Sequence, residues 1–133
     1  MPRVLVIDDD PSIRLVIGYV LRDEGYQVDE APDGQAALES IQRHHPDVIL
    51  LDMKMPAMDG WEFARRYRER YGHRAPILVL TAAQDAARRG EDVDAEDYLP
   101  KPFDLDTLVE RISALVDSTG VKGNVQGGRM DPS

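Results

Sequence analysis

Short apolar runs along the chain predict the strands of a parallel sheet. Residues 3–7, 47–51 and 76–81 are rich in leucine and β-branched residues and lack polar alternation. Runs of this kind are typical of strands that helices cover on both faces. Residues 26–30 alternate instead, which predicts a less covered strand near an edge of the sheet. Residues 95–99 indicate a fifth strand.

The interval after the first run predicts a helix with clear end signals. Asp10 stands where an N-cap is expected, Pro11 takes the first helical position, and Gly25 is placed to end the helix. From Ser12 onward, apolar residues recur at helical spacing. The residues predicted to share one face of this helix are Ile13, Val16, Ile17, Val20 and Leu21.

Three further helices are predicted over about residues 33–44, 59–71 and 104–117, and residues 82–90 predict a short, acidic one. The residues expected on the apolar faces of the three are Ala37, Leu38 and Ile41, then Phe63, Ala64 and Tyr67, then Leu105, Leu108, Ile112 and Leu115. Strand and helix therefore alternate along the chain. This order predicts an α/β fold, a doubly wound parallel sheet with right-handed crossovers and helices on both faces.

The end of the chain differs in composition from the rest. Residues 118–133 are polar and rich in glycine, which predicts a flexible tail or a truncated linker. Residues 1–117 are predicted to form one domain, a size at which a single hydrophobic core is normal.

Composition narrows the classes of function. Hydrophobic residues make up 42% and charged residues 31%, as in ordinary folded proteins. The chain has no cysteine, which excludes disulfides, thiolate metal sites and cysteine nucleophiles, and a reducing cytoplasm is the expected compartment. Neither a membrane-spanning run nor an export signal is recognisable. A net charge of −9 would repel a phosphate backbone, so we expect no nucleic-acid binding through this domain.

Polar residues with chemical potential follow several of the predicted strands. Asp8, Asp9 and Asp10 come after the first strand, Asp52 ends the third, Thr81 ends the fourth and Lys101 follows the fifth. The carboxyl ends of parallel strands meet at one edge, where ligands of open α/β sheets bind. Each residue alone is more often a cap, a strand end or a solvated side chain, but their joint occurrence in this order argues for a site.

Such a set of side chains is suited to phosphoryl transfer. Clustered carboxylates repel one another unless a cation intervenes, and Mg²⁺ prefers oxygen ligands. Asp52 is a plausible nucleophile, since carboxylates form acyl phosphates and are ionised at neutral pH without a general base. The Lys101 ammonium and the Thr81 hydroxyl would help to neutralise the charge of the phosphoryl group.

Four segments resemble, in order, the signature segments of the bacterial two-component receiver family: VLVIDDDP, DVILLDMKMPAMDG, ILVLTA and DYLPKPF. The resemblance covers about residues 3–117. It implies a flavodoxin-like receiver fold with strand order 2-1-3-4-5. It also implies a phosphorylation switch that receives its phosphoryl group from a sensor histidine kinase or a phosphotransfer protein and acts on a downstream protein or a C-terminal output domain.

The resemblance also implies individual roles. Asp52 would be the phospho-acceptor, with Asp8 and Asp9 as the acidic pair that binds Mg²⁺ or Mn²⁺. The backbone carbonyl of Lys54 would complete the metal ligands. Thr81 would be the switch hydroxyl. Two further expectations are that Tyr98 is the aromatic residue coupled to Thr81 and that Lys101 pairs with the phosphoryl oxygens, with the Lys101–Pro102 bond in cis.

The sequence departs from the family pattern in two places, the segment before the fifth strand and Lys54. The interval from Thr81 to Lys101 is about two residues shorter than usual, and Asp94-Ala95 replaces the glycine-alanine pair that often precedes the fifth strand. We therefore expect a short, mobile fourth helix and an altered output surface. Lys54 is the second departure, because its side chain lies two residues past the acceptor. Its ammonium either contacts the phosphoryl group or stays in solvent while only its carbonyl takes part.

Two alternative functions remain open on the sequence. An aspartyl-phosphate phosphatase or mutase commonly carries a second aspartate two residues after its nucleophile, but position 54 is lysine here. A receiver that only binds partners and is not phosphorylated would not need the complete set of acids, threonine and lysine. The sequence thus favours a signalling domain over an enzyme, with at most self-phosphorylation from small donors and slow autodephosphorylation.

Overall fold

The computed structural model describes residues 1–53, 60–82 and 95–118. These residues form one five-stranded sheet in which all neighbouring strands are parallel and the order is β2-β1-β3-β4-β5. The strands are β1 (Arg3–Ile7), β2 (Gln27–Ala31), β3 (Val48–Asp52), β4 (Ile77–Ala82) and β5 (Asp97–Lys101). The helices are α1 (Pro11–Asp23), α2 (Gly34–Arg43), α3 (Gly60–Tyr71) and α5 (Leu105–Ser118). The predicted fold class and strand order are confirmed.

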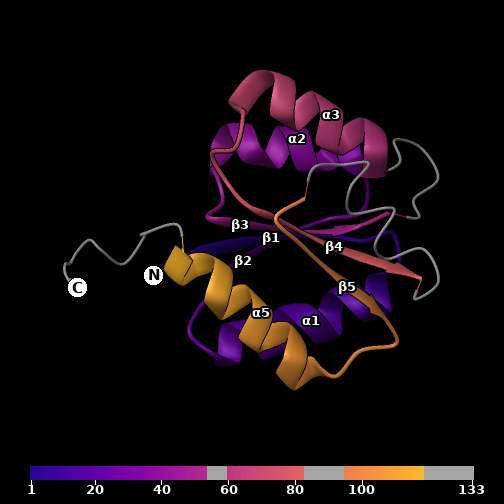
Figure 1. The fold of residues 1–133 in the computed structure, drawn as a ribbon, viewed down its shortest axis with the longest axis vertical. Helices are drawn as coiled ribbons and strands as arrows, with labels where there is room; N and C mark the ends of the chain where they lie inside the picture. Colours follow the sequence, from indigo (N-terminus) through magenta and orange to yellow (C-terminus); the bar gives the residue numbers. More distant parts are fainter. Residues whose placement is uncertain (54–59, 83–94, 119–133) are drawn as a thin grey trace.

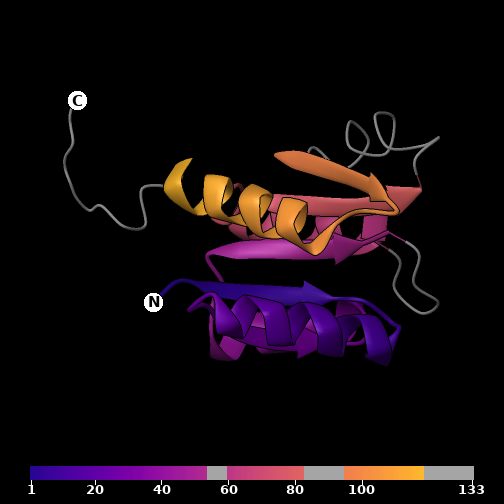
Figure 2. The ribbon, with the colours of Figure 1, turned by 90° about the horizontal axis from the view of Figure 1, so that it is seen from below.

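Helices cover both faces of the sheet. In Figure 1, α2 and α3 lie on one side of the strands, and α1 and α5 lie on the other. Alternate residues of β1 serve the two cores: Leu5 and Ile7 pack in the α2/α3 core, and Val4 and Val6 pack in the α1/α5 core. This arrangement explains why residues 4–7 of β1 are all apolar. Figure 2 shows the strand arrowheads pointing to one side, so the carboxyl ends share one edge.

The predicted end signals of the first helix are confirmed. The Asp10 carboxylate accepts hydrogen bonds from the backbone N–H groups of Ser12 and Ile13, and Pro11 begins α1. Gly25 follows the helix with a φ of 98°, a conformation that favours glycine. Asp33 caps α2 in the same way, through the N–H of Ala36.

The predicted face of α1 is only partly confirmed. Ile17 and Leu21 are buried, but Ile13 is exposed and Val16 is 49% exposed. The rotation of the helix places Gly18 against β2, where a Cβ would lie 2.9 Å from a carboxylate oxygen of Glu30. The side of α1 that carries Gly18 therefore faces the edge strand β2, and apolar residues such as Ile13 and Val16 face outward.

The fifth strand lies two residues later than predicted. It includes Pro100 and Lys101, because β5 is an edge strand, where a missing N–H is tolerated. Ala82, assigned to the predicted fourth helix, is instead the last residue of β4. The rest of that helix and Lys54 lie outside the described residues, as does the tail beyond Ser118, the last residue of α5. Among the helices of the described ranges, none has the length and apolar character to cross a membrane.

Candidate functional site

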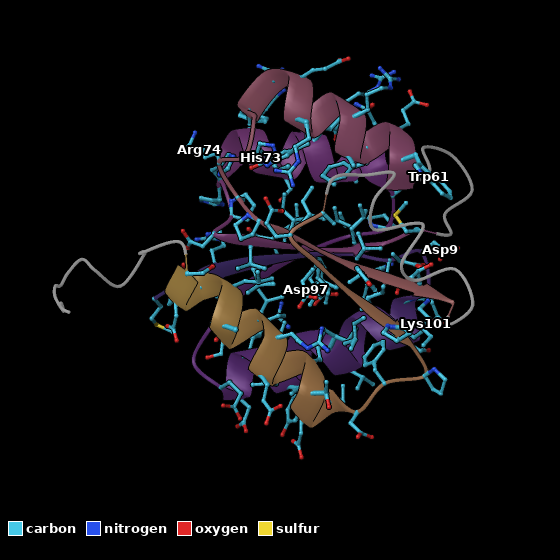
Figure 3. All side chains as sticks on the ribbon, in the orientation of Figure 1. Asp9, Trp61, His73, Arg74, Asp97 and Lys101 are labelled. Carbon is cyan, nitrogen blue, oxygen red and sulfur yellow. The ribbon has the colours of Figure 1, made fainter. Side chains whose placement is uncertain are left out.

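The residues predicted to form a site gather at the carboxyl edge of the sheet. Asp8 directly follows β1, Asp52 is the last residue of β3, Thr81 lies next to the end of β4, and Lys101 ends β5. Figure 3 labels Asp9 and Lys101 at this edge, together with Trp61 near the start of α3. The parallel register therefore brings together side chains that are 49 residues apart in the sequence, as the Lys101–Asp52 contact shows.

Three carboxylates form a compact acidic cluster at this edge. One oxygen from each of Asp8, Asp9 and Asp52 lies within 4.8 Å of the other two. Asp8 is 1% exposed and Asp52 is 3% exposed, whereas Asp9 is exposed. Two buried charges and one exposed charge of the same sign repel one another at this separation.

Asp8 is a suitable ligand for a cation. Its Oδ1 accepts a hydrogen bond of 2.9 Å from the Asp10 N–H, while its buried Oδ2 has no hydrogen-bond partner among the described residues. Burial raises the pKa of Asp8; the Asp10 hydrogen bond opposes this shift, and the charge of Asp52 adds to it. A hard divalent cation would satisfy the unpartnered oxygen and offset the repulsion, so this donor set fits Mg²⁺ or Mn²⁺.

Lys101 supplies the positive charge of the site. Its Nζ lies 3.2 Å from Oδ1 of Asp52, and its side chain is partly exposed. The Lys101–Pro102 bond is cis, as the resemblance implies. Thr81 is buried, and it follows Leu80, which pairs in register with Asp52. Thr81 thus lies one residue beyond the level of Asp52 in the sheet.

Tyr98 occupies a different position from the buried set. It lies in β5 opposite Val79, and it is 37% exposed. The structure places it outside the acidic cluster, on the outer strand of the sheet. The remaining predicted residue, Lys54, lies outside the described residues.

Sequence reasoning missed two residues that shape the site. Arg14 donates a hydrogen bond of 2.6 Å to the backbone carbonyl of Asp8. Its signal is a charged residue in line with the buried stripe of α1, three and seven positions before Ile17 and Leu21. Gly60 lies against the end of β3, where a Cβ would be 3.2 Å from the carbonyl oxygen of Asp52 and 2.8 Å from Cα of Met53. Its signal is a glycine at a predicted helix start.

Comparison with known proteins agrees with the fold and the cluster. Residues 4–113 match the family model of the response regulator receiver domain. The chain is 45% identical over 119 residues to the response regulator MprA of Mycobacterium leprae, covering 88% of this chain and 52% of that protein. MprA of Mycobacterium ulcerans is also 45% identical, with 88% and 51% covered. The chain thus spans about half the length of these relatives.

Solved structures show the same likeness. The chemotaxis response regulator CheY4 of Vibrio cholerae is 37% identical, with a TM-score of 0.78 and 86% of this chain and 98% of that chain covered. The response regulator TrrA of Thermotoga maritima, solved in complex with Mg²⁺ and BeF, is 34% identical, with a TM-score of 0.77 and 86% and 99% covered. The chain therefore belongs to the response regulator receiver domain family and is a signalling domain of the two-component type.

Proposed function

We propose that this receiver accepts a phosphoryl group on the carboxylate of Asp52 in a reaction that depends on Mg²⁺ or Mn²⁺. The observation that carries the proposal is the buried Asp52 carboxylate, which lies within 4.8 Å of two further carboxylates and 3.2 Å from an ammonium group. Burial of such a carboxylate is costly unless the charge is paired or bound to a cation, and costly groups of this kind occur chiefly at functional sites.

Asp8, Asp9 and Asp52 would hold the metal, and the backbone carbonyl of Lys54 would complete the protein ligands. When bound, the metal neutralises the charge that phosphoryl oxygens bring to three carboxylates. The unpartnered Oδ2 of Asp8 supports this assignment. The related TrrA, solved with Mg²⁺ and BeF, is consistent with it.

The chain's own side chains account for the transfer. An oxygen of Asp52 attacks phosphorus, so that a P–O bond forms while the bond between phosphorus and the donor's leaving group breaks. The leaving group, an imidazole when the donor is a phosphohistidine, departs with the electron pair. Lys101 pairs with the phosphoryl oxygens, and the Thr81 hydroxyl turns toward them. Tyr98 responds to Thr81 and changes the surface near β5.

The partners follow from this chemistry. A sensor histidine kinase or a phosphotransfer protein donates the group, and the modified surface acts on a downstream protein or a C-terminal output domain. We assign the receiver to residues 1–117, residues 118–133 to a tail or linker, and the protein to the cytoplasm. Nucleic-acid binding through this domain and membrane insertion have no place in the proposal. Self-phosphorylation from small donors and slow autodephosphorylation are the only catalytic activities that it includes.

Incubation with acetyl phosphate and Mg²⁺, followed by intact mass measurement, tests the proposal. The wild type should gain one phosphoryl group. Asp52→Asn should gain none, because an amide cannot form the acyl phosphate, and chelation of the metal should prevent the gain in the wild type. Modification of Asp52→Asn to the same extent as the wild type would place the acceptor elsewhere. A wild type without any gain, from acetyl phosphate or from a phosphorylated donor domain, would favour a receiver that only binds partners.

A further inference from the structure

The backbone of Asp8 is fixed from two neighbouring elements. Its N–H donates a hydrogen bond of 3.1 Å to the carbonyl of Ala31, the last residue of the edge strand β2. Its carbonyl accepts a hydrogen bond of 2.6 Å from Nη1 of Arg14 on α1. A bond from a charged donor at this length is stronger than a bond between neutral groups. The residue that carries the unpartnered carboxylate oxygen therefore has its main chain held on both sides.

Arg14 also forms an ion pair with the edge strand, at a distance too long for a hydrogen bond. Its side chain is 17% exposed, and its Nε lies 3.7 Å from Oε1 of Glu30, the neighbour of Ala31. The other carboxylate oxygen of Glu30 lies 3.1 Å from Nη2 of Arg22, which follows Arg14 by eight residues in α1. Gly18 lies beneath the Glu30 carboxylate, which allows α1 to approach the strand closely. Glu30 thus lies between two arginines, of which only Arg14 also bonds to Asp8.

This geometry links the edge strand to the acidic cluster. The direction of a short side chain such as Asp8 follows its backbone, and its carboxylate lies among Asp9 and Asp52. A shift of the Asp8 carbonyl would therefore move one of the metal-binding oxygens. Arg14 does not lie among the three carboxylates, so any effect on the metal passes through Asp8.

We propose that Arg14 is a positioning residue for the metal site, which it serves by holding the Asp8 carbonyl while Glu30 orients its guanidinium. The inference rests on the proposed metal-dependent function and names a residue that sets the affinity of that site. Groups that orient metal ligands commonly change metal affinity by about 10–100-fold when they are removed. Arg14 acts on the backbone of a ligand, so the lower end of that range is expected.

The test compares two arginines that share Glu30. Arg14→Gln should raise the Mg²⁺ dissociation constant about 10-fold. Arg22→Gln removes the same charge from the same carboxylate without touching Asp8, and it should change the constant by about twofold or less. Arg14→Lys keeps a charged donor and should recover part of the loss. Binding is measured by calorimetry and by the fluorescence of Trp61, the single tryptophan, which lies at this edge.

A second readout separates positioning from general damage. At saturating Mg²⁺, the rate of phosphorylation of Arg14→Gln by acetyl phosphate should return to about the wild-type value, because the loss lies in metal binding. Thermal unfolding in EDTA reports whether each variant is folded. If Arg14→Gln does not fold, Glu30→Gln takes its place, since it keeps the bond to Asp8 but loosens the guanidinium. Glu30→Gln should raise the Mg²⁺ dissociation constant above that of the wild type, but by less than the roughly 10-fold increase expected for Arg14→Gln.

The outcomes distinguish the role of Arg14 from the proposed metal-dependent function on which it rests. Absence of Mg²⁺ binding by the wild type would overturn the proposed metal site itself. Binding by the wild type and by folded Arg14→Gln with equal affinity would overturn the role of Arg14 alone. An equal loss in Arg22→Gln would also overturn it, because the effect would then come from the charge around Glu30 and not from the bond to Asp8.

Discussion

At the scale of single residues, Asp8 is a site where stability and function oppose each other. The pKa of Asp8 is raised, chiefly by burial, so ionisation of this side chain costs more in the folded protein than in the unfolded chain. Asp8→Asn should therefore increase the free energy of unfolding in EDTA by about 1–2 kcal/mol, because the neutral amide removes the buried charge that Asp52 and Asp9 repel, and one pKa unit corresponds to about 1.4 kcal/mol. Urea unfolding of both proteins at neutral pH measures the difference.

A matched variant shows whether burial is the cause. Asp9 belongs to the same cluster but is exposed, so Asp9→Asn should change the free energy of unfolding by only about 0.5 kcal/mol. Added Mg²⁺ should stabilise the wild type, because a ligand that binds the folded state shifts the equilibrium toward it, and should stabilise Asp8→Asn much less. An Asp8→Asn protein that is less stable than the wild type in EDTA would contradict this account.

The residues of the candidate site were more predictable than those that position them. Asp8, Asp52, Thr81 and Lys101 follow apolar strand runs, and parallel topology alone brings strand ends together. Arg14 pairs with Glu30 across 16 positions, on elements whose relative rotation no periodicity determines. Tertiary partners of this kind leave only a weak trace in a single sequence.

At the scale of elements, the start of α3 packs closely against the end of β3, which carries Asp52. Gly60 leaves no room for a Cβ, which would lie 2.6 Å from the sulfur of Met53, 2.8 Å from the Cα of Met53 and 3.2 Å from the carbonyl oxygen of Asp52. Gly60→Ala should therefore lower the free energy of unfolding by about 1–3 kcal/mol, although alanine is the better helix former. It should also slow phosphorylation, because the strand end that carries Asp52 must shift. Urea unfolding and the acetyl phosphate reaction measure the two effects.

Another helical glycine provides the comparison. A Cβ at Gly18 meets the end of the flexible Glu30 side chain, which can move at little cost. Gly18→Ala should thus remain within about 1 kcal/mol of the wild type, because the gain in helix propensity offsets the contact. Equal destabilisation by both substitutions would show that the backbone contact at Gly60 has no special weight.

The elements also show where a hydrophobic pattern becomes ambiguous. The apolar runs of β1, β3 and β4 and the end signals of α1 predicted these elements within one or two residues. In α1, by contrast, apolar residues occupy most of the helix surface, and Leu15, Val16 and Tyr19 face outward. The packing of Ile17 and Leu21 in the α1/α5 core and the approach of Gly18 to β2 show which part of this wide stripe is buried.

At the scale of the whole molecule, the two ends of the sheet differ in their polar side chains. The carboxyl edge holds the acidic cluster and Lys101, whereas a hydrogen-bond network surrounds Tyr67 near the amino end. The Tyr67 hydroxyl accepts a hydrogen bond of 3.0 Å from the Ala75 N–H and lies 3.1 Å from Nε2 of His45. Nδ1 of His45 lies 3.0 Å from the carbonyl of Pro46. A neutral imidazole satisfies both contacts, donating from Nδ1 and accepting the Tyr67 O–H at Nε2.

This network predicts how global stability depends on pH. Burial and the charge of Arg74 lower the pKa of His45, so the folded state binds a proton less readily than the unfolded state. The contribution of His45 is fully present above the ordinary histidine pKa of about 6.5 and is lost as the pH falls below it. Asp8 acts in the opposite direction, because its pKa is raised. The prediction therefore concerns the difference between the wild type and His45→Gln, which should shrink between pH 7.5 and 5.5 in urea unfolding. His44→Gln, at the exposed neighbouring residue, should follow the wild type across this range. A difference between the wild type and His45→Gln that does not change with pH would show that the imidazole is as easily protonated in the folded network as in the unfolded chain.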